Sequence, residues 1–136
     1  MGQIHQILRS HGLRVTNTRT SILNLFVTSS SALSNKLIEE SLPELDRITL
    51  YRTLRTFEDK GIIHQAVDST SITKFALCVQ DCDEHHHKDH HAHFHCQRCK
   101  KTYCIDEINL PDVELPQDFS PSSTYLVVEG LCSSCN

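Results

Sequence analysis

The stretch ITLYRTLRTFEDKGII, residues 48–63, decides the fold. Its apolar residues repeat at helical spacing and share one stripe, namely Leu50, Leu54 and Phe57. Arg52 and Arg55 lie on the opposite side, and Gly61 is placed to end the helix. Alone, this pattern fits an ordinary surface helix with solvated arginines better than a DNA-reading helix, so the flanking sequence has to decide.

Three shorter helical patterns precede this stretch. The first covers residues 3–11 and ends at Gly12, and the second begins after Thr16, a good N-cap residue. The third begins after Ser34 and stops near Pro43. The residues that we expect these helices to bury are Ile4, Ile7, Leu8, Ile22, Leu23, Phe26, Leu37 and Ile38.

Two strand patterns follow the helix. Residues 62–67 and 73–79 are rich in apolar and β-branched side chains, and the polar turn 68–71 joins them. Short helices followed by a β-hairpin form a winged helix-turn-helix. In that fold, residues 48–60 would enter the major groove of DNA.

Charge is divided unevenly along the 136 residues, whose formal net charge is −4. Residues 1–65 carry eight Lys or Arg against six Asp or Glu, whereas residues 66–136 carry five against eleven. Seven of the ten histidines lie between His85 and His95. A mildly basic half can face phosphate, and an acidic half rich in His and Cys suits divalent cations.

Two C-x-x-C motifs stand in the second half of the chain. Each motif turns tightly enough to aim two thiolates at one ion, and two motifs complete a closed tetrahedral site. A redox role would need a thioredoxin-like βαβ context, which is missing, and an odd count of seven cysteines argues against a secreted disulfide framework. We therefore predict one structural zinc ion per chain, with the ligands Cys96, Cys99, Cys132 and Cys135.

The rest of the second half contains few apolar residues that could form a core. Residues 80–93 are too polar to pack and are expected to form a loop, and three prolines in residues 109–121 leave little room for a regular helix. The strand candidates are residues 92–96, 102–105 and 124–129. Helices followed by two groups of strands predict an α+β fold.

Several protein classes are not expected. The sequence lacks a run of roughly 18–20 apolar residues, which a membrane span needs. Its first residues, MGQIHQILRSHG, have neither the basic nor the apolar region of a signal peptide, so we expect a cytoplasmic protein. An enzyme with a small-molecule substrate is not expected either, because a four-thiolate site has no open position and neither a Ser/His/Asp set nor a Gly-rich phosphate loop is legible.

With these motifs the chain resembles the Fur (ferric uptake regulator) family of bacterial metalloregulators over nearly its whole length. The resemblance rests on GLRVT at 12–16 with Arg19, ITLYRTL at 48–54 with Phe57, GII at 61–63, the His-rich run before Cys96, and GLCSSC at 130–135. It implies a homodimer that binds palindromic operator DNA. The implied domains are a winged-helix DNA-binding domain at 1–80, a His/Asp-rich hinge loop at 81–90 and a small α/β zinc-binding dimerisation domain at 91–136.

The resemblance also implies DNA contacts. Tyr51 would pack against thymine methyl groups, Arg52 would reach base edges or phosphate, and Arg14 would enter an AT-rich minor groove. Bound metal would hold the two wings at operator spacing, and DNA affinity would fall without it. The expected DNA-binding residues are Arg14, Thr16, Arg19, Thr49, Tyr51, Arg52 and Arg55.

A second, regulatory metal site follows from the zinc-uptake regulators of the family. They place one ligand after the Gly-hydrophobic-hydrophobic turn, a cysteine at the end of the second wing strand and histidines shortly before the first zinc cysteine. The matching residues are His64, Cys78, His91 and His93. This nitrogen- and sulfur-rich set suits Zn(II). The iron and peroxide sensors use oxygen-richer sites. Their two acidic ligands are replaced here by Ala92 and Cys104, and two of their histidines by Ala32 and Thr124.

Alternatives remain open in the His-rich loop. Residues 81–88 look like an insertion, so Cys82 could compete with Cys78 as a ligand, and His90 could form a further site with Asp106 or Glu107. A solvated, metal-sticky loop without a defined site fits residues 85–87 equally well.

The main hypothesis is a zinc-responsive repressor of metal-uptake genes. An iron-, manganese- or peroxide-responsive member of the same family is the first alternative. A His-rich zinc or nickel storage or delivery protein is the second, and the helix with Tyr51 and Arg52 argues against it, because storage needs no groove-fitting helix.

Overall fold

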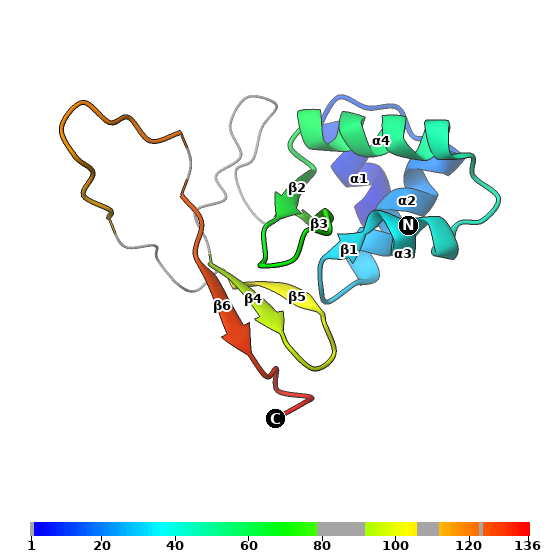
Figure 1. Ribbon diagram of the computed structural model, residues 1–136. Coiled ribbons are helices and arrows are strands. Elements are labelled where there is room, and N and C mark those ends of the chain that lie inside the picture. The colour runs from blue at the N-terminus through cyan, green and yellow to red at the C-terminus, as the bar shows by residue number, and fades with distance from the viewer. Residues whose placement is uncertain (1, 79–91, 106–111, 123) are drawn as a thin grey trace.

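The computed structural model describes residues 2–78, 92–105, 112–122 and 124–136 (Figure 1). The predicted hinge loop, with the ligand candidates Cys82 and His90, lies outside these residues, as do His91, Asp106 and Glu107.

Four helices form the first part of the chain, and short polar caps begin three of them. The N-cap side chains of α2, α3 and α4 accept hydrogen bonds from backbone N–H groups and are Thr16, Ser34 and Asp46. Gly12 and Gly61 follow α1 and α4 with φ of 75° and 79°, a conformation that favours glycine. The helix bounds are α1 Gly2–Ser10, α2 Asn17–Thr28, α3 Asn35–Ser41 and α4 Arg47–Asp59.

The helices pack around one apolar core. Its fully buried members include Leu8, Ile22, Leu23, Ile38 and Phe57, all at 0% exposure, and the predicted stripe of α4 faces it. The prediction for Leu37 was wrong, because this side chain is 46% exposed. Successive helical residues point about 100° apart, and α3 turns Ile38 inward instead.

A small antiparallel sheet completes the winged-helix part. Strands β1 (Leu33–Ser34), β2 (Ile63–Ala66) and β3 (Lys74–Leu77) are ordered β1-β3-β2. The predicted hairpin is present but shorter, and we call β2 and β3 with their connection the wing hairpin. Residue pairs His64 with Ala76 and Ala66 with Lys74 face each other across it.

A second three-stranded sheet lies below the wing hairpin in Figure 1. Strands β4 (Ala92–Cys96), β5 (Thr102–Ile105) and β6 (Val127–Gly130) are ordered β5-β4-β6, antiparallel between β5 and β4 and parallel between β4 and β6. β4 and β5 match the predicted bounds, whereas β6 begins three residues later than expected. Residues 112–122 extend away from both sheets (Figure 1).

Among the described residues, none of the helices has the length and apolar character that crossing a membrane requires.

Candidate metal centres and DNA-binding surface

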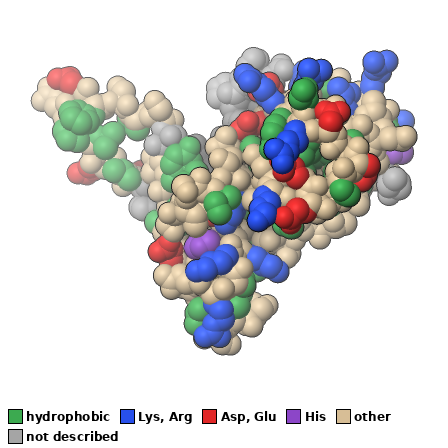
Figure 2. All heavy atoms as spheres, turned by 45° about the vertical axis from the view of Figure 1, so that its right-hand side comes forward, with side chains coloured by type: hydrophobic (Ala, Val, Ile, Leu, Met, Phe, Trp, Pro, Cys, Tyr) green, Lys and Arg blue, Asp and Glu red, His purple; other side chains and the backbone are tan. Residues whose placement is uncertain are grey.

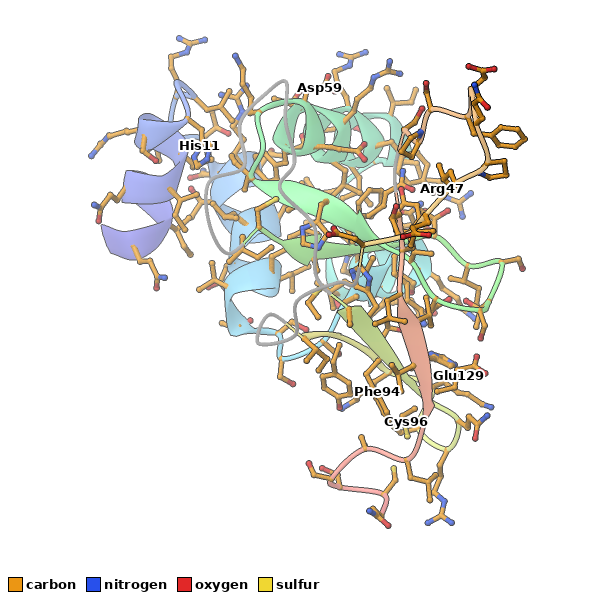
Figure 3. The ribbon with its side chains drawn as sticks, turned by 90° about the vertical axis from the view of Figure 1, so that its left-hand side faces the viewer. His11, Arg47, Asp59, Phe94, Cys96 and Glu129 are labelled. Atoms are coloured by element: carbon orange, nitrogen blue, oxygen red, sulfur yellow. The ribbon has the colours of Figure 1, made fainter. Side chains whose placement is uncertain are left out.

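The two C-x-x-C motifs meet at one end of the second sheet. Parallel pairing of β4 with β6 aligns Cys96 with Gly130, so the turn after β4 and the turn after β6 lie side by side. Figure 3 shows Phe94 and Cys96 beside Glu129. The guanidinium of Arg98 donates to the carbonyl of Cys135 at 3.0 Å and so links one turn to the other. Strand topology thus brings together two pairs of thiols that 32 intervening residues separate in the sequence.

This cysteine cluster fits a zinc ion. All four Sγ atoms lie within 4.8 Å of one another, and Cys99 Sγ and Cys132 Sγ are 3.8 Å apart. A tetrahedron with Zn–S bonds of about 2.3 Å separates its sulfurs by about 3.8 Å, whereas a disulfide would need about 2.05 Å. The predicted ligand set therefore has the spacing of a closed structural site.

The thiols of this cluster differ in pKa. Backbone N–H groups of Cys132 and Cys99 lower the pKa of the Cys96 thiol to about 5. A hydrogen bond with Cys132, together with burial, raises the pKa of Cys135 to about 12. Four thiolates at this spacing repel one another, so full deprotonation requires a cation at their centre.

A second cluster joins the wing hairpin to the second sheet. His64 of β2, His93 of β4 and Cys104 of β5 bring one ligand atom each within 4.8 Å of the others. His64 Nε2 and Cys104 Sγ are 3.5 Å apart, and the rings of His64 and His93 have centroids 6.1 Å apart. Both histidines are buried, at 2% and 1% exposure. Two imidazoles and one thiol form a donor set that Zn(II) prefers.

Cys104 had no assigned role in the sequence analysis, although it was noted where related sensors carry an acid. The signal was available in the strand alternation. β4 and β5 pair antiparallel with His93 opposite Cys104, so the two side chains share one face of the sheet. Side chains directly opposite each other on paired strands lie close together, and histidine and cysteine are both zinc ligands, so this pair can contribute to one metal site.

Cys78 lies on the other side of the same imidazole. Its Sγ is 3.4 Å from His64 Nδ1, whereas Cys104 lies at Nε2. A single imidazole ring binds a given metal ion through only one nitrogen, so an ion at Nε2 lies beside Cys104 and on the far side of the ring from Cys78. Cys78 has the position from which a neighbour fixes the tautomer of a ligand. The expected partner His91 lies outside the described residues.

The outer face of α4 presents most of the expected DNA-binding side chains. Tyr51, Arg52 and Arg55 are exposed there, and Arg14 is exposed before α2. Figure 2 shows Lys and Arg side chains along the upper edge of the helical part. A row of cations beside an exposed aromatic ring suits a phosphate-lined groove.

Three expected DNA contacts have local structural partners. Thr16 accepts a hydrogen bond from the backbone N–H of Arg19, and the Thr49 hydroxyl donates to Asp46 at 3.0 Å. Arg19 also donates from Nη1 to the carbonyl of Arg14 at 3.0 Å. Thr16 and Thr49 thus stabilise the first turns of α2 and α4, and Arg19 fixes the backbone carbonyl of Arg14.

Glu39 of α3 was not predicted as part of this surface. Tyr51 Oη donates a hydrogen bond to Glu39, and this bond raises the pKa of the tyrosine. The other carboxylate oxygen lies 3.8 Å from Arg47 Nε. Glu39 thus connects α3 to the exposed face of α4.

Residues 10–124 match the Ferric uptake regulator family. The chain belongs to this family. The ferric uptake regulation protein of Neisseria meningitidis serogroup A is 31% identical over 141 residues, covering 94% of the chain and 90% of the relative. That of Staphylococcus aureus is 33% identical over 141 residues, covering 96% and 93%. The peroxide-responsive repressor PerR of Staphylococcus saprophyticus is 29% identical, covering 94% and 86%.

Solved structures share the fold of this Fur-family chain. The Vibrio cholerae ferric uptake regulator has a TM-score of 0.59 at 23% identity, covering 94% of the chain and 98% of the other. A zinc uptake regulator complexed with zinc and DNA has a TM-score of 0.64 at 20% identity, covering 98% and 90%. The predicted α+β fold with an N-terminal winged helix-turn-helix is confirmed, and this Fur-family chain is a metal-responsive transcription regulator, not an enzyme.

Proposed function

We propose that this regulator is a zinc-responsive repressor of metal-uptake genes, which acts as a cytoplasmic homodimer on palindromic operator DNA. The observation that carries the proposal is the cluster of His64, His93 and Cys104, because its donors are nitrogen and sulfur and because it spans the wing hairpin and the second sheet. The likeness in fold to a zinc uptake regulator with zinc and DNA supports it.

The donor set favours zinc over iron or manganese. Fe(II) and Mn(II) prefer six-coordinate sites rich in carboxylate oxygens, whereas Zn(II) binds imidazole and thiolate in tetrahedral sites. Within the part of the chain that the structure describes, the cluster contains no carboxylate. We assign His64, His93 and Cys104 as sensory ligands, with His91 as the candidate for the fourth position and Cys82 as its competitor. We assign Cys78 as the neighbour that fixes the tautomer of His64.

The proposed signal passes through the wing hairpin. His64 belongs to the same hairpin that follows α4, and His93 and Cys104 belong to the second sheet. A divalent cation, when bound, supplies the attraction that holds these three side chains together. Drawing them together fixes the wing and α4 relative to the second sheet, and so stabilises one arrangement of the DNA-binding helices.

A second copy of the chain would cover the exposed apolar residues of the C-terminal part. Large apolar side chains that gather in an exposed part of a chain are typical of protein–protein interfaces. The segment that extends away from the sheets in Figure 1 contributes several of them. The exposed residues are Val113, Leu115, Phe119, Tyr125, Val128 and Leu131.

Arg52→Ala should weaken operator binding by about 1–3 kcal/mol, because a bidentate contact between arginine and a base edge contributes about that much. Arg52 is exposed on α4 and makes no contribution to the apolar core, so the variant should fold normally. Fluorescence anisotropy at fixed salt measures the change. Arg9→Ala, on the last turn of α1, is the matched control. Equal affinities for Arg52→Ala and the unmodified protein would show that α4 does not read DNA.

Metal selectivity tests the proposed function directly. Anisotropy would be recorded with DNA from upstream of the protein's own gene across buffered free Zn(II), Mn(II) and Fe(II). We expect tight binding switched on at very low free Zn(II) and little response to the other ions. Equal or better activation by Fe(II) or Mn(II) would point to an oxygen-richer site that includes His90, Asp106 or Glu107. Zinc uptake by many ions per chain without any DNA response would favour storage.

A further inference from the structure

The wing hairpin and the β4–β5 hairpin meet face to face through two neighbouring layers of side chains. On β4 and β5, the pair His93 and Cys104 is followed two residues along by the pair His95 and Thr102. Alternate residues of a strand share a face, so both pairs face the same way. The first pair meets His64, and the second meets Asp68 and Lys74 of the wing hairpin. The metal-ligand cluster therefore has a polar neighbour on the same interface.

This neighbour, which we call the Asp68 cluster, consists of Asp68, Lys74, His95 and Thr102. Asp68 Oδ2 accepts hydrogen bonds from Thr102 Oγ1 at 2.6 Å and from Lys74 Nζ at 2.9 Å, and His95 Nδ1 lies 3.7 Å away. Thr102 Oγ1 also accepts from Lys74 Nζ at 3.0 Å and lies 3.0 Å from His95 Nδ1. Thr102 Oγ1 thus donates to Asp68 and accepts from Lys74, with His95 Nδ1 also within hydrogen-bond distance.

The cluster is buried and charged. The side chains of Asp68 and Lys74 are 1% and 9% exposed, that of His95 is 6% exposed, and Thr102 is 0% exposed. Burial raises the pKa of Asp68, but hydrogen bonds from Thr102, Thr70 and Lys74 outweigh it and hold the pKa well below its usual range. Asp68 is therefore a carboxylate. Removing one partner of a buried ion pair costs far more than removing an exposed one.

Further bonds reinforce the contact at the same place. Lys74 Nζ also donates to the carbonyl of Lys100 at 3.3 Å, and the backbone N–H of Ala32 donates to the carbonyl of Thr102 at 2.7 Å. Lys74 thus adds a second hydrogen bond between the wing hairpin and the β4–β5 hairpin, and Ala32, which precedes β1, adds one from the winged-helix part to β5.

We propose that Asp68 is a positioning residue for the sensory metal site, whose buried carboxylate clamps the wing hairpin onto β4–β5 and so holds His64 at the pair His93 and Cys104. The inference rests on the proposed function, in that it assigns those three residues as sensory ligands. Asp68 touches none of them in the contacts above and acts by holding their two hairpins in register.

The clamp sets the metal concentration at which the regulator responds. A site assembled in only a fraction of molecules binds its ligand more weakly by that same fraction. With the clamp intact, a larger fraction of molecules has the two hairpins docked before zinc binds, so less of the free energy of zinc binding is spent on docking. Without the clamp, we expect the zinc needed for half-maximal DNA binding to rise at least tenfold, which corresponds to a fall of the docked fraction to about one tenth or less.

Asp68→Asn tests the clamp, because the amide keeps the shape of the side chain but loses its charge. Thr102→Val is the second variant, which removes the donor to Asp68 with little change in volume and decides the matter should Asp68→Asn not fold. The matched control is Asp59→Asn, an exposed carboxylate at the end of α4. DNA binding would be followed by anisotropy across buffered free Zn(II), after confirming that each protein retains its structural zinc.

The expected result is a zinc midpoint shifted at least tenfold in both variants, with an unchanged plateau of DNA binding at saturating zinc. A general folding defect would lower the plateau instead and would overturn the assignment, as would wild-type midpoints. Hydrogen exchange of amides 74–77 and 102–105, in protein freed of sensory metal by a chelator, should be faster in the variants than in Asp59→Asn. Unchanged exchange would exclude a clamp. Activation of the unmodified protein by Mn(II) alone would contradict zinc sensing, and the exchange measurement would still decide the clamp.

Discussion

Cys96→Ser should abolish the folded C-terminal half and, with it, zinc-dependent DNA binding. Structural zinc in small thiolate sites contributes an apparent free energy of about 10–16 kcal/mol, which equals or exceeds the whole stability of a typical domain, about 5–15 kcal/mol. Cys96 is fully buried at the end of β4, and backbone N–H groups lower the pKa of its thiol to about 5. Loss of this thiolate leaves only three ligands for the ion, and a domain this small has too little apolar core to compensate for weaker metal binding.

The measurements are zinc content after treatment with a chelator, thermal unfolding followed by circular dichroism, and size-exclusion chromatography. Gln97→Ser is the matched control, because it places serine in the same turn at an exposed position that is not a ligand. We expect the control to retain zinc and the Cys96→Ser protein to lose one zinc ion per chain and its cooperative transition. A folded, zinc-loaded Cys96→Ser protein would refute the structural assignment.

Cys104→Ser should leave the fold and the structural zinc intact but raise the zinc needed for DNA binding by roughly a hundredfold or more, since even outer partners of a ligand contribute 10–100-fold to metal affinity. Cys78→Ser should have the smaller effect of the two. The geometry gives the reason, because Cys104 lies at Nε2 of His64 within the three-residue cluster and Cys78 lies at Nδ1 outside it.

Cobalt substitution separates the two roles spectroscopically. A thiolate bound to Co(II) gives an intense near-ultraviolet charge-transfer band, and we expect Cys104→Ser to remove the band of the sensory site while Cys78→Ser retains it. Cys104→Asp serves as the conservative variant and should restore a metal response with relatively better activation by Mn(II). The opposite order, with the band lost in Cys78→Ser, would restore the ligand set that the sequence alone suggested.

The fold was predictable because its elements carry local signals. The caps Thr16 and Ser34, the glycines after α1 and α4, and the apolar stripe of α4 act over a few residues, so the sequence reveals them directly. Leu37 was misassigned because a short helix has too few apolar residues to show which of its faces is buried. Only the packing of Ile38 into the core reveals that Leu37 lies on the exposed side.

The candidate metal sites were predictable to different degrees. Two C-x-x-C motifs identify their own partners, since each pair supplies half of a tetrahedron. The role of Cys104 depends on the register between β4 and β5, and that of Asp68 on how two hairpins dock, both of which are long-range. No local pattern distinguishes Asp68 from the other acidic residues of the second half, because its carboxylate is matched by Lys74 only after folding.

Strand β4 belongs to both proposed metal sites. His93 faces the wing hairpin, and Cys96, three residues on, faces the other way at the end of the same strand, so about 10 Å of chain separates the two. On the proposed assignment, the ion at the cysteine site holds the strand that positions His93, so we expect the cysteine site to fill first. We therefore expect the sensory site to have the lower zinc affinity of the two. The affinity of the cysteine site then sets the lowest free zinc concentration to which the regulator can respond. Below that concentration the cysteine site loses its ion, and the strand that positions the sensory ligands is no longer held.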